Sequence, residues 1–105
     1  MNVTFRFIFC FFIFPLYSFS QLYTISGYVK EESTGESLLG TNVYIKENLK
    51  GTTTNQYGFY SLTVPDTSFT LVFSYIGFQS QEFPLKLNKN IKLNVNLKSN
   101  DIDAI

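Results

Sequence analysis

The amino-acid sequence predicts an all-β protein built as a seven-stranded antiparallel β-sandwich. Apolar and polar residues alternate in short runs through most of the chain after residue 20, and this period of two is typical of strands with one buried face. Turn-forming residues separate these runs about every 8–12 residues, a spacing common in sandwiches. No stretch keeps the 3.6-residue period that a helix requires.

The first three expected strands lie in the N-terminal half of this region. Tyr23–Lys30 alternates clearly, and the polar, Gly-containing segment Glu31–Glu36 predicts a turn. Thr41–Lys46 alternates again, and Asn48–Gly51 carries the next turn signal. Thr52–Thr54 is β-branched throughout, which suits a short strand.

Four more strands are expected after the turn Asn55–Gly58. They are Phe59–Val64, Thr70–Tyr75, Phe78–Phe83 and Ile91–Lys98, and the last alternates without interruption. One face of each strand is expected to fill the core and the other to meet water. The expected inward residues are Ile25, Gly27, Val29, Thr41, Val43, Ile45, Tyr60, Leu62, Val64, Leu71, Phe73, Tyr75, Ile91, Leu93, Val95 and Leu97. The last strand is expected at a sheet edge, where its lysines would oppose edge-to-edge pairing.

Residues 1–20 differ in composition from the rest and are interpreted as a cleavable signal peptide. Arg6 precedes an apolar run, Phe7–Tyr17, which is shorter than the roughly 20 residues of a membrane-spanning helix. Small residues precede the expected cleavage site between Ser20 and Gln21. The alternatives are a buried apolar segment of the fold and an uncleaved anchor.

The composition excludes several classes of site. The chain has no His and a single Cys, which excludes a His-dependent catalytic set, a His-ligated or all-Cys zinc site and an internal disulfide. Eight basic residues balance eight acidic ones, and a neutral chain is a poor partner for nucleic acid. We therefore expect no catalytic residue, no metal and no cofactor.

Four segments carry motifs that occur together in one family. They are Ile25–Val29, Gly35–Val43, Gly51–Leu62 and Leu71–Phe78. In this order they resemble the carboxypeptidase-regulatory-like domain, a transthyretin-like (prealbumin-like) sandwich. The resemblance divides the chain into a signal peptide at 1–20, the β-sandwich domain at 21–98 and a C-terminal tail at 99–105.

The segment Ser74–Phe78 is similar to the version of this domain at the N-terminus of SusC-like, TonB-dependent outer-membrane receptors of Gram-negative bacteria. In that family the domain follows a signal peptide and precedes a TonB box, a plug and a β-barrel. The resemblance implies an exported protein of the periplasm or outer membrane, with the plug and barrel or a periplasmic energiser as protein partners and no membrane span in the mature chain. The acidic-apolar residues Asp101–Ile105 occupy the place of the TonB box, and the alternative is a frayed polar tail.

The sequence is compatible with two classes of function. The first is a non-catalytic accessory module of such a receptor, acting in protein contact or gating. The second is a stand-alone exported module that binds a glycan or a protein. An enzyme is not expected, because the related transthyretin-like hydroxyisourate hydrolases use histidines and metallocarboxypeptidases carry zinc in a separate domain.

Two groups of residues are singled out. The first group contains glycines expected to specify the fold at turns and close approaches: Gly27, Gly40, Gly58 and Gly77. The second contains outward-facing aromatic residues that form either a contact surface or cross-strand pairs: Tyr28, Tyr44 and Phe59. The polar run Thr52–Asn55 is interpreted as a strand followed by a turn-capping Asn.

Overall fold

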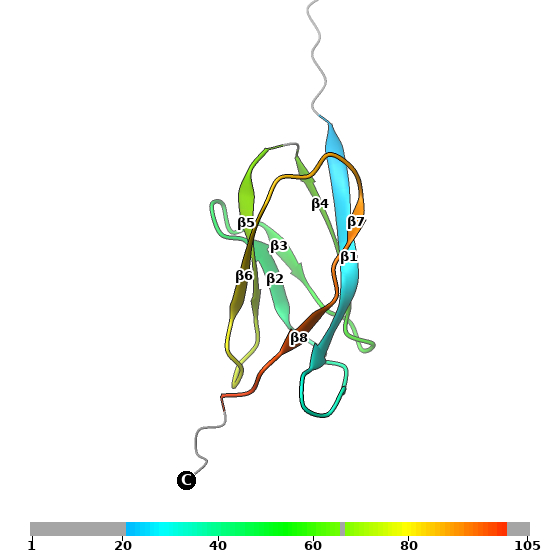
Figure 1. The fold of residues 1–105 in the computed structure, drawn as a ribbon, viewed down its shortest axis with the longest axis vertical. Coiled ribbons are helices and arrows are strands. Elements are labelled where there is room, and N and C mark those ends of the chain that lie inside the picture. The colour runs from blue at the N-terminus through cyan, green and yellow to red at the C-terminus, as the bar shows by residue number, and fades with distance from the viewer. Residues whose placement is uncertain (1–20, 66, 101–105) are drawn as a thin grey trace, which may run out of the picture.

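Two β-sheets lie face to face in the computed structural model, which describes residues 21–65 and 67–100 (Figure 1). The predicted all-β sandwich is confirmed. The interpretation of residues 1–20 as a signal peptide ending at Ser20, and of residues 101–105 as a tail, concerns parts of the chain outside the described residues. Both remain predictions.

The first sheet is organised around β1 (Leu22–Glu31). β1 pairs antiparallel with β4 (Phe59–Pro65), in a register that sets Gly27 opposite Tyr60. On its other side β1 pairs in parallel with two short strands, β7 (Ile91–Lys92) and β8 (Val95–Leu97). These two strands lie at the edge of the sheet, as expected from the sequence.

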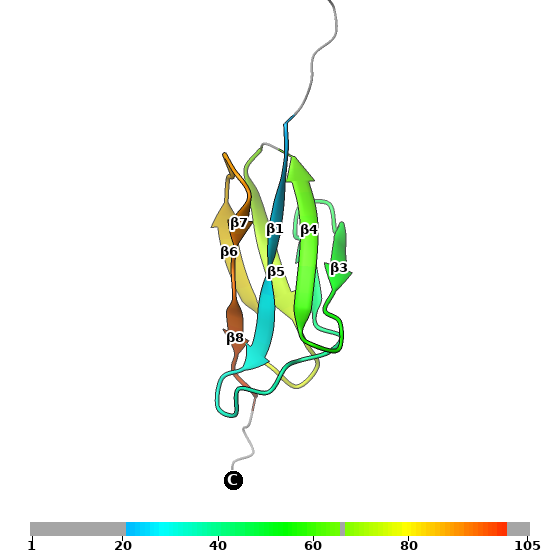
Figure 2. The same ribbon diagram turned by 90° about the vertical axis from the view of Figure 1, so that its right-hand side faces the viewer.

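The second sheet is entirely antiparallel and has the order β3-β2-β5-β6. Its two central strands are β2 (Asn42–Ile45) and β5 (Phe69–Ser74). Its edge strands are β3 (Gly51–Thr53) and β6 (Gln81–Leu85). In Figure 2 the first sheet, with β1 and β4, lies in front of the second sheet.

The prediction of seven antiparallel strands is wrong in two respects. The expected strand Ile91–Lys98 is divided into β7 and β8 by Leu93 and Asn94, so that the described residues contain eight strands. Both of these strands run parallel to β1. The first six strands alternate in direction, so β7 and β8 run in the same direction as β1. Because they lie directly beside β1, their pairing with it is parallel.

The sixth expected strand, Phe78–Phe83, is shifted toward the C-terminus, because β6 covers Gln81–Leu85. Phe78 instead forms an isolated antiparallel bridge with Ser99. Pro84 lies inside β6 although it lacks an amide hydrogen. An edge strand tolerates such a residue, since one of its sides has no neighbouring strand.

The core lies between the sheets and follows the predicted alternation. Its largest fully buried side chains are Tyr60, Phe73, Ile25, Leu71, Leu97, Val29, Val43 and Val64. The ring of Phe73 packs edge-on against Tyr60 of the first sheet and against Phe83 of the second, with centroid distances of 5.3 and 5.7 Å. Val72 departs from the pattern, because it is buried although it faces away from Leu71 and Phe73.

The loops and turns that connect the strands lie at the two ends of the sandwich (Figures 1 and 2). One end carries the β1–β2 loop (Glu32–Thr41), the β3–β4 turn (Thr54–Gly58) and the β5–β6 turn (Tyr75–Ser80). Asn100 lies at the same end, because its amide donates to the carbonyl of Gly77 in the β5–β6 turn. We call this end the C-terminal pole. The opposite end, which we call the N-terminal pole, carries Gln21 and the β2–β3 loop Lys46–Lys50.

Candidate functional site

Gly27 lies where three strands of the first sheet meet. It pairs with Tyr60 of β4, and the Tyr60 hydroxyl donates a hydrogen bond of 2.6 Å to the carbonyl of Leu93. The amide of Leu93 in turn donates to the carbonyl of Ser26 at 2.8 Å. A Cβ at Gly27 would collide with the Leu93 carbonyl. Glycine is therefore required here for close approach and not for a special dihedral angle.

Two asparagine side chains extend the pairing of β1 beyond the two residues of β7. Oδ1 of Asn90 accepts a hydrogen bond from the amide of Thr24, and Oδ1 of Asn94 accepts one from the amide of Tyr28, each at 2.9 Å. These side chains replace the backbone carbonyls that a longer strand would supply. Sequence reasoning missed both residues, because Asn94 fits the alternation as an ordinary outward position.

Burial raises the pKa of the Tyr60 hydroxyl above its usual value near 10. In the unfolded chain this hydroxyl ionises at about pH 10, whereas in the folded protein it keeps its proton to higher pH. Unfolding above about pH 10 therefore releases a proton, and stability falls as the pH rises. Below about pH 10 the contribution of Tyr60 to stability is fully present.

Tyr60→Phe is expected to flatten this alkaline loss of stability. The variant should lose about 1 kcal/mol at neutral pH, the cost of one hydrogen bond. Its melting temperature should then fall less steeply than that of the wild type between about pH 9.5 and 11.5. Thermal denaturation followed by circular dichroism measures both effects. Parallel curves over this range would contradict the assignment to Tyr60.

The other three glycines singled out from the sequence have positive φ angles. These are 87° at Gly40, 76° at Gly58 and 86° at Gly77, all in the left-handed region that favours glycine. Each lies in a loop or turn of the C-terminal pole. Leu49 is the non-glycine residue with positive φ in the described chain, at 60°, and its side chain is exposed in the β2–β3 loop.

A buried hydrogen-bond network joins the β1–β2 loop to the end of β3. The hydroxyl of Thr54 donates to the carbonyl of Leu38 and accepts a 2.9 Å hydrogen bond from the amide of Thr41. Thr41 and Thr54 are both buried, and their side-chain oxygens have partners. Asn55 caps the following turn, because its Oδ1 accepts from the amides of Tyr57 and Phe59. These contacts agree with a structural interpretation of Thr52–Asn55.

Thr54→Val is expected to destabilise the domain by about 1–3 kcal/mol, because the buried amide of Thr41 loses its hydrogen bond to Thr54 and the carbonyl of Leu38 is left with the longer hydrogen bond of 3.4 Å from the Thr41 hydroxyl. Thr54→Ser, which keeps the hydroxyl and loses one methyl group, is the matched control and should cost less. Urea denaturation measures both variants. A loss for Thr54→Val that is smaller than the loss for Thr54→Ser would contradict the hydroxyl as the main contribution of Thr54.

The three outward-facing aromatic residues, expected to form either a contact surface or cross-strand pairs, do not all lie together. Tyr28 and Phe59 form a cross-strand pair on the first sheet, with ring centroids 5.2 Å apart and a tilt of 59°. Tyr44 lies on β2 of the second sheet. The structure therefore provides an aromatic pair and a separate single tyrosine.

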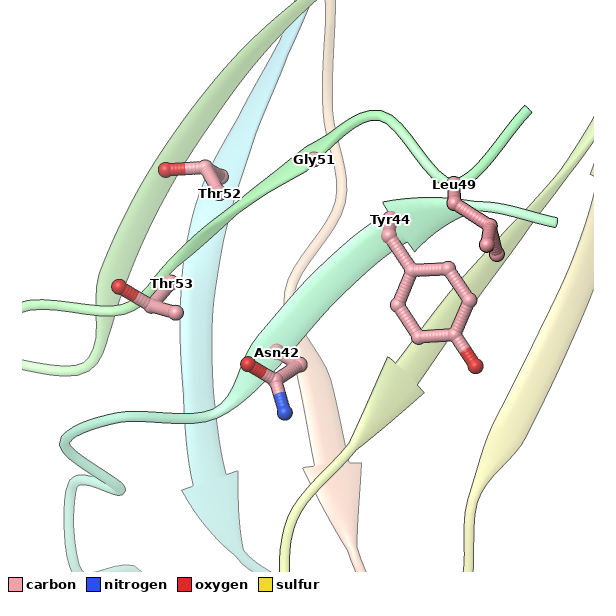
Figure 3. A pocket seen from close by; sticks show the side chains of 6 residues that line it. All are labelled: Asn42, Tyr44, Leu49, Gly51, Thr52 and Thr53. Atoms are coloured by element: carbon pink, nitrogen blue, oxygen red, sulfur yellow. The ribbon is translucent and has the colours of Figure 1, made fainter.

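Tyr44 borders a shallow concavity of about 550 Å³ along β2 and β3 (Figure 3). Its lining combines an aromatic ring, an exposed leucine, an amide and hydroxyl groups: Asn42, Tyr44, Leu49, Gly51, Thr52 and Thr53. A Cβ at Gly51 would collide with the backbone at Val43 and Tyr44. The sequence placed Gly51 in a turn signal and at the start of one family motif, and gave no indication of this close approach.

Two carboxylates on the surface, Glu47 and Glu82, have polar partners. The amide and hydroxyl of Thr70 donate to Oε1 and Oε2 of Glu47 at 2.9 and 3.1 Å, and the backbone hydrogen bond lowers the pKa of this carboxyl. Lys46 forms an exposed ion pair of 3.2 Å with Glu82. Within residues 21–65 and 67–100, no three His, Cys, Asp or Glu side chains form a group suited to a metal ion.

The same part of the chain contains no helix with the length and hydrophobicity needed to cross a membrane.

Comparison with known proteins places this sandwich in a family. The model of the CarboxypepD_reg-like domain matches residues 25–104. A TonB-dependent receptor P3 from Formosa agariphila is 33% identical over 86 residues, covering 82% of this chain and 9% of the receptor. TonB-dependent receptor SusC from Bacteroides thetaiotaomicron is 37% identical over 76 residues, covering 72% of this chain and 7% of the receptor. The chain thus spans less than a tenth of the length of these relatives.

Solved structures support the fold. A cohesin–X-dockerin complex from Acetivibrio cellulolyticus superposes with a TM-score of 0.60 at 20% identity, covering 70% of this chain and 52% of that one. A putative membrane-associated protein of unknown function from Bacteroides fragilis gives a TM-score of 0.59 at 22% identity, covering 80% and 30%. The chain belongs to the CarboxypepD_reg-like domain family and matches the N-terminal region of TonB-dependent receptors.

Proposed function

We propose that this protein is the non-catalytic N-terminal module of a TonB-dependent outer-membrane receptor, and that it acts by protein contact or gating beside the receptor body. The module is exported by the signal peptide expected at residues 1–20, is cleaved before Gln21, and works on the periplasmic side of the outer membrane. Its partner is the plug and barrel of a receptor or a periplasmic energiser. Import itself belongs to those other parts.

The observation that carries this proposal is the similarity to receptors over most of the chain. The alignments with two receptors cover 82% and 72% of this chain, and so include most of both sheets. The family match reaches residue 104 and includes the acidic-apolar residues Asp101–Ile105 except the last. The absence of His from the entire sequence agrees with a role other than His-dependent hydrolysis.

Two experiments test the proposal. The first is to sequence the DNA that follows the codon for Ile105 in the genome. A coding region for a plug and barrel, in frame or frameshifted, supports a receptor module, whereas a stop codon and an unrelated gene would favour a stand-alone module. The second is to place an epitope tag in the exposed loop 32–36 and fractionate the cell envelope. The proposal requires the tagged species in the outer membrane.

The concavity of Figure 3 favours one alternative function, binding of a glycan by a stand-alone module. Sugar sites combine an aromatic face with amide and hydroxyl groups, and Tyr44, Asn42 and Thr53 supply these chemistries here. A glycan array probed with the purified protein and with Tyr44→Ala separates the two functions. Binding that depends on Tyr44 supports the alternative, and binding to receptor components without binding to glycans supports the receptor module.

A further inference from the structure

Three turns of the C-terminal pole share one arrangement, in which an exposed apolar side chain directly precedes a glycine with positive φ. The pairs are Leu39–Gly40, Tyr57–Gly58 and Ile76–Gly77. The apolar side chains are 57%, 63% and 89% exposed, respectively. Isolated exposed apolar residues are common. Three of them on three turns at one end of a small domain indicate a contact surface.

Hydrogen bonds hold the β5–β6 turn in place. The amide of Phe78 donates to the carbonyl of Tyr75 at 3.0 Å, and Gly77 has the positive φ that a type II turn requires at its third position. The amide of Asn100 donates to the carbonyl of Gly77 at 2.9 Å. The turn is therefore fixed from both sides, and Ile76 is presented to solvent on an ordered backbone.

The other two turns are held in the same way. The amide of Gly40 donates to the carbonyl of Thr54 at 3.0 Å, next to the buried Thr41–Thr54 network. The amides of Tyr57 and Gly58 donate to the side-chain and backbone oxygens of Asn55 at 2.8 and 2.9 Å. Binding through such turns costs little backbone ordering, which is a property of good docking surfaces.

The three turns also contact one another through the β1–β2 loop. A Cβ placed on Gly58 would lie 3.3 Å from the amide nitrogen of Leu38, and one on Gly40 would lie 4.0 Å from Cε1 of Tyr75. Figures 1 and 2 both place the three connections at the same end of the sandwich. The three turns thus lie at one end of the domain, and we call their three exposed apolar side chains the tip surface (Leu39, Tyr57 and Ile76).

The C-terminal part of the chain leaves the sandwich beside this surface. After β8 the backbone crosses to the β5–β6 turn, where the amide of Gln79 donates to the carbonyl of Lys98 and the amide of Asn100 to that of Gly77, each at 2.9 Å. A polypeptide that continues from Asn100 is therefore delivered next to Ile76. The neighbouring β1–β2 region is acidic, with Glu31, Glu32 and Glu36, although Lys30 and Lys98 flank it.

We propose that the tip surface docks onto the body of a TonB-dependent receptor. Ile76 is the central anchor and enters an apolar site of the receptor. Basic residues of the receptor border this site where it faces the acidic β1–β2 loop. This inference rests on the function proposed above and names the surface through which that function operates. Neither the Tyr28–Phe59 pair nor the concavity beside Tyr44 takes part in this contact.

Photo-crosslinking in the bacterium that encodes the protein tests the inference. p-Benzoylphenylalanine replaces Tyr57 or Ile76 at the tip surface, Tyr28 on the first sheet, or Leu49 at the N-terminal pole, and mass spectrometry identifies the crosslinked peptides. We expect crosslinks from positions 57 and 76 to receptor peptides, in the same or a separate polypeptide, and none from position 49. Ile76→Asp should lower the yield from position 57 by about tenfold or more.

Leu49→Asp is the matched control, because Leu49 is an equally apolar side chain, 73% exposed, at the opposite pole. This variant should leave the yield from position 57 unchanged, and neither variant should melt below the wild type, since Asp tolerates the positive φ of Leu49. Receptor crosslinks from position 28 or 49 without any from 57 or 76 would overturn the docking inference and leave the receptor function intact. Crosslinks between two copies at position 76 would also overturn it. No receptor peptide at any position would overturn the proposed function itself.

Discussion

Phe73→Ala is expected to remove most of the stability of this domain, by about 3–5 kcal/mol. A domain of this size has a total unfolding free energy of about 4–12 kcal/mol, so the variant should be largely unfolded at moderate temperature. Phe73 is fully buried, and its ring packs edge-on against Tyr60 of one sheet and Phe83 of the other. Its removal therefore opens a cavity at the place where the two sheets meet.

Urea denaturation followed by circular dichroism measures this loss, with tyrosine fluorescence as a second probe because the chain has no Trp. Phe73→Leu is the matched control, since it keeps most of the volume and loses the two ring contacts. It should cost about 1–2 kcal/mol, the scale of aromatic pair interactions plus a small cavity. An alanine variant within about 1 kcal/mol of wild type would show that the sheets do not depend on this contact.

The sequence was sufficient to predict the inward face of the strands that alternate clearly. In β1, for example, Ile25, Gly27 and Val29 alternate with polar or outward residues, and all three are buried in the structure. A one-residue shift in register would expose the whole apolar set, so the alternation specifies burial strongly. The predicted strand Thr41–Lys46 shows the same agreement, and in Phe59–Val64 the inward residues Tyr60 and Val64 are buried while Leu62 is partly buried against the core.

The local alternation does not predict which strands pair with one another. The pairing of β8 with β1 joins Val95 to Val29, residues far apart in the chain. The alternation of Ile91–Lys98 is the same whether its neighbour runs parallel or antiparallel, so the sequence gives no sign of direction. The break at Leu93–Asn94 depends on Tyr60 and Gly27, which lie on two other strands. Long-range hydrogen bonds, and not local propensity, decide these features.

The aromatic residues considered as a contact surface were also predicted only in part. Period-two alternation places Tyr28, Tyr44 and Phe59 on outer faces, but it does not say which sheet each face belongs to. Only the strand order separates Tyr44 from the other two. The tip surface had a signal in the sequence, an apolar residue before glycine in three expected turns or strand ends. That signal can be interpreted as one surface only when the fold shows that the three turns lie at the same end of the sandwich.

Gly27→Ala is expected to destabilise the domain by about 3 kcal/mol or more, the upper part of the range for overpacking a dense site. The added Cβ would overlap the carbonyl of Leu93 and would approach Oδ1 of Asn94 to 2.9 Å. Both neighbours are fixed, because Leu93 bonds Ser26 and Tyr60 while Asn94 bonds the amide of Tyr28. The edge formed by β7 and β8 must therefore move away from β1, and these hydrogen bonds are lost together.

Gly35→Ala separates this steric effect from the general cost of replacing glycine. Nothing lies within 4 Å of a Cβ at Gly35, but its φ of 74° makes alanine unfavourable by about 1–2 kcal/mol. Thermal and urea denaturation of both variants should give the larger loss for Gly27→Ala, although Gly27 has an ordinary φ. The reverse order would contradict close approach as the role of Gly27. Because β8 leads directly to Lys98 and Asn100 beside Ile76, displacement of this edge should also reduce receptor crosslinking from position 76 in molecules that remain folded.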